Sequence, residues 1–108
     1  MKYKKIDSGA LRPSIWKVGY IRTDFHKLSD LFGDPKESVD SKVGIEWTLK
    51  FEDGTIAIIH DWKEKEGPER TRNWTVKGNN MKSFYYMVAI VKKHYKPTIR
   101  DIFGETLK

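Results

Sequence analysis

The 108-residue sequence contains no cysteine. This absence excludes disulfides, thiolate-bound metals and cysteine nucleophiles, and it is typical of proteins from a reducing compartment. Long apolar runs are missing as well, since no stretch approaches the roughly 18 apolar residues that a membrane helix needs. The N-terminus, Met1 to Lys5, leads into polar residues rather than into an apolar signal segment. We therefore expect a cytoplasmic protein that does not contact a membrane.

Histidine is scarce, with residues at positions 26, 60 and 94 only. No two of them have the spacing that places metal ligands on one helical face or on neighbouring strand positions. His60 could act as a base or be a hydrogen-bonded core residue, and no serine, threonine or cysteine is placed by the pattern to serve as its nucleophile. The sequence therefore predicts a protein without metal or cofactor that is not an enzyme.

Acidic residues are outnumbered by basic ones, 15 against 21, which gives a formal net charge of +6. This balance favours anionic partners such as nucleotides, nucleic acid or acidic proteins, although a highly charged, solvated surface would produce it too. A chain of this length forms one domain around one core.

The clearest pattern in the sequence is a β-hairpin. Apolar residues occupy every second position from Val43 to Phe51, and Asp53-Gly54 is typical of a two-residue type I′ turn. The returning strand then covers residues 55–63. This turn predicts a register in which Phe51 faces Ile56, Leu49 faces Ile58, Trp47 faces His60, Ile45 faces Trp62, and Glu46 faces Asp61 on the other side.

The remaining elements follow from the same rules. Apolar alternation predicts strands over residues 15–22 and 73–77, and apolar residues at helical spacing predict helices over 24–32 and 81–95. A polar loop should follow the first helix up to about residue 41.

These elements define the expected architecture. The order is β-α-β-β-β-α, and the fold class is α+β, with an antiparallel sheet and a long C-terminal helix packed on one face in two layers. We expect an N-terminal arm at residues 1–14, ordered only where it docks, a single domain at 15–96 and a C-terminal tail at 97–108.

Glu46 and Asp61 are the most unusual polar pair of the predicted hairpin, because like charges directly opposite one another destabilise strand pairing. They could form a carboxylate pair for metal binding or acid–base work. Alternatively, Lys63, Lys50 or an arginine from a neighbouring strand neutralises them.

Tryptophan is abundant, and Trp16, Trp47, Trp62 and Trp74 all fall on apolar strand positions, where we expect them to fill the core. A ring that reaches the edge of the sheet beside a cation would instead stack a nucleobase while the cation binds its phosphate. The candidate ligand-binding residues are Arg22, Trp62, Lys63, Trp74, Lys77 and Asn79.

The predicted C-terminal helix is apolar around most of its circumference. Met81, Phe84, Tyr85, Val88, Val91 and Tyr95 form one face, and Met87 and Ile90 widen it. A helix of this kind is buried deeply or shared with another subunit, so we expect a homo-oligomer that assembles through this helix or the tail. The alternative is coverage by the N-terminal arm.

Several short motifs are spread over residues 15–80. They are Gly19-Tyr20-Ile21-Arg22-Thr23, Leu28, Leu31-Phe32-Gly33-Asp34-Pro35, Glu46-Trp47, Phe51-Glu52-Asp53-Gly54-Thr55, Asp61-Trp62-Lys63 and Trp74-Thr75-Val76-Lys77-Gly78. With these motifs the chain resembles a family of small proteins encoded by bacteriophages and by some large DNA viruses. This chain has His60 where that family tends toward tyrosine, and Gly78-Asn79 where it tends toward Gly-Gly.

The resemblance implies a viral accessory protein in the cytoplasm of a host cell, and it implies no catalytic chemistry. We expect such a protein to act by binding, most concretely by sequestering a nucleotide-type host defence signal at a subunit interface. The alternatives are nucleic-acid binding through a basic face and inhibition of a host defence protein by direct contact.

Overall fold

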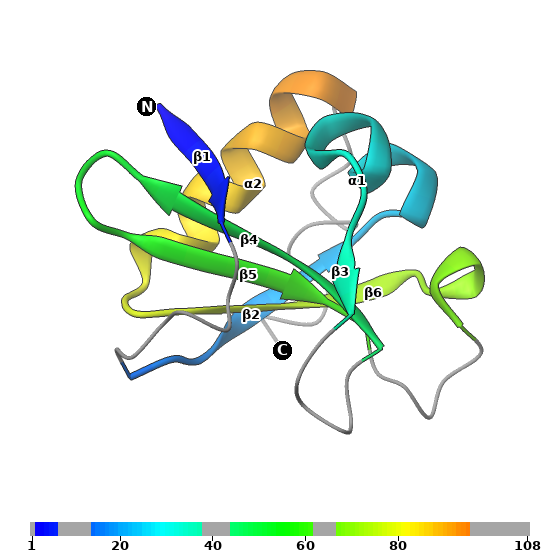
Figure 1. Cartoon of the computed structure of the whole chain (residues 1–108), viewed down its shortest axis with the longest axis horizontal. Coiled ribbons are helices and arrows are strands. Elements are labelled where there is room, and N and C mark those ends of the chain that lie inside the picture. The colour runs from blue at the N-terminus through cyan, green and yellow to red at the C-terminus, as the bar shows by residue number, and fades with distance from the viewer. Residues whose placement is uncertain (1, 7–13, 38–43, 62–66, 96–108) are drawn as a thin grey trace.

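The computed structural model describes residues 2–6, 14–37, 44–61 and 67–95 (Figure 1). Within them the chain is an α+β protein, as predicted, and its strands form one six-stranded antiparallel sheet. The elements in chain order are β1 Tyr3–Ile6, β2 Trp16–Arg22, α1 Phe25–Phe32, β3 Lys36–Glu37, β4 Ile45–Phe51, β5 Ile56–His60, the 3-10 helix η2 Pro68–Arg70, β6 Asn73–Gly78 and α2 Lys82–Tyr95.

The strands run across the sheet in the order β1-β4-β5-β6-β2, and β3 pairs with β4 as well. Two of them were not predicted: β1 lies in the expected N-terminal arm, and β3 lies in the expected polar loop. Both are short and rich in lysine, a composition that natural proteins use at sheet edges to prevent further strand pairing. The arm therefore contributes a strand to the sheet.

The predicted hairpin register is wrong by one residue. Trp47 pairs with Ile59 and Glu46 pairs with His60. The cause is a three-residue turn, in which the Phe51 N–H donates to the Thr55 carbonyl at 2.8 Å and the Gly54 N–H donates to the Phe51 carbonyl at 3.0 Å. Gly54 has a φ of 89°, as the third position of such a loop requires.

This slip exchanges the two faces of β5, because successive side chains of a strand point to opposite sides. Trp47 shares its face with Ile59, and His60 lies on the opposite face with Glu46 and Thr75. His60 is therefore not on the Trp47 face, where the predicted register placed it.

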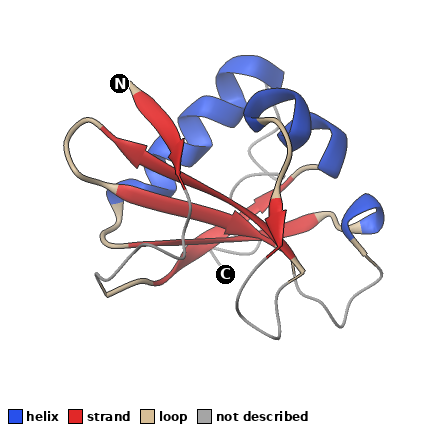
Figure 2. Ribbon diagram, in the orientation of Figure 1, coloured by secondary structure: helices blue, strands red, loops and turns tan. Residues whose placement is uncertain are grey.

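Both helices lie over the same side of the sheet (Figure 2). The Trp47 and Trp74 rings meet beneath them with centroids 5.7 Å apart. Gly19 lets α2 approach closely, because a Cβ there would lie 2.6 Å from the Phe84 ring. The buried apolar residues that form the core are Val18, Ile21, Leu28, Phe32, Trp47, Leu49, Phe51, Ala57, Ile59, Trp74, Val76, Phe84, Met87, Val88 and Val91.

Three of the expected core aromatic and methionine residues are exposed instead. Trp16, at the start of the edge strand β2, is 47% exposed, and Met81 and Tyr85 are 47% and 58% exposed. The buried stripe of α2 runs through Phe84, Met87 and their neighbours, whereas Tyr85 lies beside this stripe and Met81 precedes the helix, which begins at Lys82. No helix within the described part of the chain is long and apolar enough to cross a membrane.

A hydrogen bond joins α2 to the hairpin turn. The Tyr86 hydroxyl donates to the Asp53 carboxylate at 2.7 Å, and the Thr55 N–H donates to the other oxygen at 2.9 Å. These two hydrogen bonds hold the pKa of Asp53 at about 2, below its ordinary value of 3.8, and the bond from Tyr86 has the larger effect. Ionised Asp53 therefore stabilises the fold above pH 3.8, and this stabilisation is lost as the pH falls through about 2.

Replacing Tyr86 with phenylalanine should raise the pKa of Asp53 toward 3.8, because the main donor to its carboxylate is removed. Carboxyl carbon shifts followed by NMR during an acid titration measure this pKa directly. Tyr85→Phe is the matched control, since the Tyr85 side chain is exposed. An Asp53 pKa that stays near 2 in Tyr86→Phe would contradict the assignment.

Candidate functional site

The edge of the sheet beside β4 is built from two separate strands. Ile6 of β1 pairs with Thr48, and Lys36 of β3 pairs with Glu46, so the break between the two strands lies opposite Trp47. Alternate residues of an antiparallel strand direct their backbone groups to opposite neighbours. The Phe51 N–H donates to the Thr55 carbonyl, on the side of β5, so the backbone groups of Trp47 also point toward β5 and not into the break.

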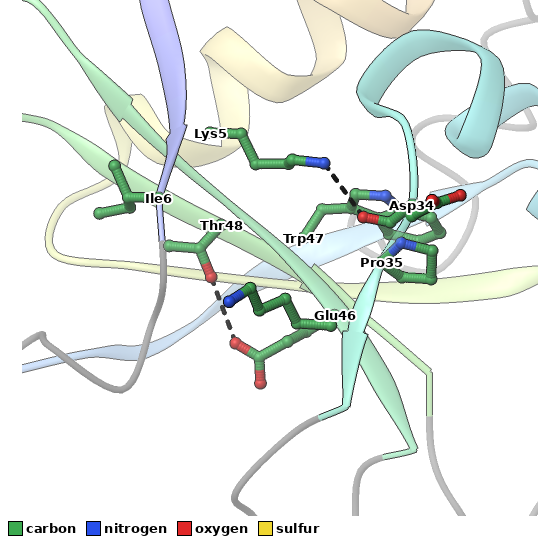
Figure 3. Close-up of a pocket in the computed structure, with 8 residues that line it drawn as sticks. Lys5, Ile6, Asp34, Pro35, Glu46, Trp47 and Thr48 are labelled. Carbon is green, nitrogen blue, oxygen red and sulfur yellow. Dashed lines mark hydrogen bonds between the residues drawn. The ribbon is translucent and has the colours of Figure 1, made fainter.

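A pocket of about 430 Å³ opens at this break (Figure 3). We call it the edge pocket. Its volume falls within the range of about 300–1,000 Å³ that is usual for small-molecule sites. It is lined by Lys5, Ile6, Asp34, Pro35, Lys36, Glu46, Trp47 and Thr48.

The inner wall of the edge pocket carries a buried carboxylate. Glu46 is 6% exposed, and the Thr48 hydroxyl donates to its Oε2 at 3.2 Å. An ionised carboxylate has about four acceptor positions, so this bond leaves Glu46 able to accept further hydrogen bonds. The wall is therefore suited to a ligand group that donates N–H or O–H hydrogen bonds.

The rim of the pocket is held by two bonds to the segment that follows α1. The Lys5 Nζ donates to the Asp34 carbonyl at 3.1 Å, as Figure 3 shows, and the Trp47 Nε1 donates to the Gly33 carbonyl at 2.8 Å. An ammonium group has three donors, so Lys5 can also bind an anion. Gly33 ends α1 with a φ of 77°, which turns the chain toward β3.

His60 lies beside Glu46 in a polar row that crosses the sheet through Thr75 to Tyr20. Its Nδ1 is 2.7 Å from the Asp61 carbonyl, and because a carbonyl only accepts, Nδ1 carries the proton. Burial lowers the pKa of His60 below its ordinary value of 6.5, and the bond to Asp61 opposes this effect in part. The ring is therefore held neutral at pH 7.

This burial gives a pH-dependent stability. The pKa of His60 is lower in the folded than in the unfolded chain. The contribution of neutral His60 to the free energy of unfolding is therefore complete above pH 6.5 and declines as the pH falls below that value. Urea unfolding at pH 7.5 and 5.5 should show a loss of stability in the wild type that is smaller in His60→Gln. The exposed His26 supplies the control, and a His26→Gln effect equal to that of His60→Gln would contradict this account.

Asp61 does not form a carboxylate pair with Glu46. Its buried Oδ1 accepts the backbone N–H groups of Gly44 at 3.0 Å and Ile45 at 2.9 Å. In the observed register Glu46 faces His60, so the expected like-charge contact is replaced by a backbone clamp at the start of β4.

Those sequence-predicted ligand residues that the structure describes do not converge. Arg22 pairs with Asn73, at the opposite end of β6 from Asn79, and Lys77 pairs with Lys17 on the face away from the helices. Trp74 is fully buried, and its Nε1 donates to the Thr23 carbonyl at 3.2 Å, so this ring cannot stack a ligand. Trp62 and Lys63 lie outside the described residues.

The Asn79 side chain links two strands of the sheet and is not directed to a ligand site. Its Oδ1 accepts the Ile56 N–H at 3.0 Å and its Nδ2 donates to the Gly54 carbonyl at 3.2 Å, which ties the end of β6 to the hairpin. Of the residues that line the edge pocket, only Glu46 was a sequence-based site candidate, and the polar lining residues that were missed are Lys5, Asp34, Lys36 and Thr48. No periodic signal in the sequence indicates the edge strand near them, because Tyr3-Lys4-Lys5-Ile6 does not alternate apolar and polar residues.

The described residues contain no group of three or more histidines, aspartates and glutamates arranged to hold a metal ion. No protein-family model, curated protein or solved structure matches this chain.

Proposed function

We propose that this chain is a non-enzymatic binding protein that holds a nucleotide-type ligand in the edge pocket. The observation that carries the proposal is the composition of a pocket of small-molecule size, which combines Lys5 and Lys36 with the buried carboxylate of Glu46. The lysines supply cations for phosphate, and Glu46 supplies an acceptor for the donors of a base or ribose.

The mixed charge of the pocket favours a nucleotide over a simple anion. Glu46 and Asp34 would repel a bare phosphate, whereas a nucleotide offers both anionic oxygens and hydrogen-bond donors. Guanine presents an amino group and a ring N–H side by side, a better match to a carboxylate than the single amino group of adenine. We therefore expect GTP to bind more tightly than ATP.

The biological role that we propose is sequestration of a nucleotide-type host defence signal by a viral accessory protein. The resemblance of the short motifs supports this role, and binding without turnover is sufficient for it. Self-association through α2 stays a prediction, and it is favoured by Tyr85, which is exposed on that helix, and by Met81, which is exposed just before it.

Thermal unfolding with a panel of adenine and guanine nucleotides, including cyclic dinucleotides, tests the proposal. A ligand present at 100 times its Kd stabilises the folded state by about 2.7 kcal/mol, which produces a clear rise in Tm. The absence of a rise with every nucleotide at millimolar concentration would contradict it. The oligomeric mass, measured in parallel, tests self-association.

Nucleic-acid binding is the second candidate, and the face away from the helices favours it. Lys4 pairs with Lys50 across β1 and β4, and Lys17 pairs with Lys77 across β2 and β6. Opposed like charges destabilise a sheet unless an anion lies near them. If this candidate is right, the protein binds any single-stranded DNA weakly, and its affinity falls steeply as the salt concentration rises. Nucleotide binding in the edge pocket does not require such DNA binding.

A further inference from the structure

A second cavity, of about 290 Å³, lies at the start of α1, at the other end of that helix from the edge pocket. We call it the arginine cavity, and its lining residues are Arg22, Thr23, Asp24, Lys27 and Arg72. The Thr23 N–H donates to the Arg72 carbonyl at 2.9 Å, and this pairing of the chain segments next to β2 and β6 brings Arg22 and Arg72 to one site.

Neither guanidinium of this cavity forms a hydrogen bond or ion pair within the described part of the chain. The one carboxylate of the lining, Asp24, is engaged as the cap of α1, where its Oδ1 accepts the Lys27 N–H at 2.9 Å. The helix end is therefore already capped, and the positive potential of the cavity comes from its side chains.

We propose that the arginine cavity binds the phosphate group of a small molecule, independently of the edge pocket. A guanidinium presents paired N–H donors that match two oxygens of a phosphate, and an anion between Arg22 and Arg72 relieves their mutual repulsion. A carboxylate ligand would leave part of this charge uncompensated, since it carries one negative charge against two guanidinium groups. The cavity thus extends the proposed function by a second anion site.

Titration with inorganic pyrophosphate, followed by amide NMR, tests this site. We expect shifts at Thr23 and Asp24, and a Kd that rises at least tenfold in Arg22→Gln and in Arg72→Gln. Arg70→Gln is the matched control, because Arg70 is exposed on η2 and does not line the cavity. Two arginine variants are used so that a folding defect in one of them does not decide the result.

The outcomes separate the two sites. Pyrophosphate binding at Thr23 and Asp24 that persists in Lys36→Ala supports an independent arginine cavity. An unchanged Kd in both arginine cavity variants overturns it, and so does an equal loss in Arg70→Gln, which would indicate diffuse attraction. Displacement of pyrophosphate from these residues by a short single-stranded oligonucleotide also overturns it, because the ligand would then be a nucleic-acid backbone.

Discussion

Replacing Asp61 with alanine should lower the free energy of unfolding by about 3 kcal/mol. The substitution removes the buried acceptor of the Gly44 and Ile45 N–H groups and leaves both donors without their partner. Hydrogen bonds to a charged group contribute about 1.5–3 kcal/mol each, and an unsatisfied buried donor costs about as much. Urea unfolding at pH 7 measures the loss.

Two variants bracket this result. Asp61→Asn keeps an acceptor oxygen at the same place, so its loss of unfolding free energy should be less than half of the loss in Asp61→Ala. Asp30→Ala removes an exposed aspartate on α1 and should change stability by no more than about 0.5 kcal/mol. A loss below about 1 kcal/mol in Asp61→Ala would mean that the clamp at the start of β4 contributes little.

Replacing both Lys5 and Lys36 with alanine should weaken the binding of GTP by about 100-fold. Each lysine in contact with phosphate is expected to contribute at least about 1.4 kcal/mol, which corresponds to a factor of ten in Kd. Isothermal titration calorimetry measures both affinities. Both side chains are exposed, and although the Lys5 bond to the Asp34 carbonyl is lost, the Trp47 bond to the Gly33 carbonyl still holds the rim of the pocket.

The double variant Lys4→Ala and Lys50→Ala is the control for this experiment. It removes the same charge from a cross-strand lysine pair on β1 and β4 that does not line the edge pocket. Its affinity for GTP should fall by no more than about threefold, because neither lysine lines the pocket and an exposed charge without direct contact is partly screened by salt. Equal losses in the two double variants would indicate attraction by net charge alone and would contradict a specific site.

Much of the fold follows from local patterns. The alternation from Ile45 to Phe51, the helix that starts after Asp24 and the long helix that starts after Met81 were all predicted near their observed bounds. The register was not, because Asp53-Gly54 suits two-residue and three-residue turns alike. Because the turn has three residues instead of two, His60 lies on the other face of the sheet and Glu46 does not face Asp61.

The edge pocket could not be predicted for a different reason. It forms where Ile6 and Lys36, 30 positions apart in the sequence, reach neighbouring positions on β4. A two-residue strand such as β3 has no periodicity to detect, and a polar tetrapeptide such as β1 is indistinguishable from a flexible arm. Trp74 fills the core, as its apolar strand position predicted, and is therefore wrong as a candidate ligand-binding residue.

Amide chemical-shift mapping during a GTP titration tests the central claim most directly, since it locates the ligand as well as detecting it. The account predicts that the largest shifts fall on Ile6, Lys36, Glu46 and Thr48, and that they disappear in the Lys5 and Lys36 double alanine variant. Shifts confined to Lys17, Lys77 and their neighbours, or no shifts at millimolar GTP, would contradict a nucleotide site at the split edge of the sheet.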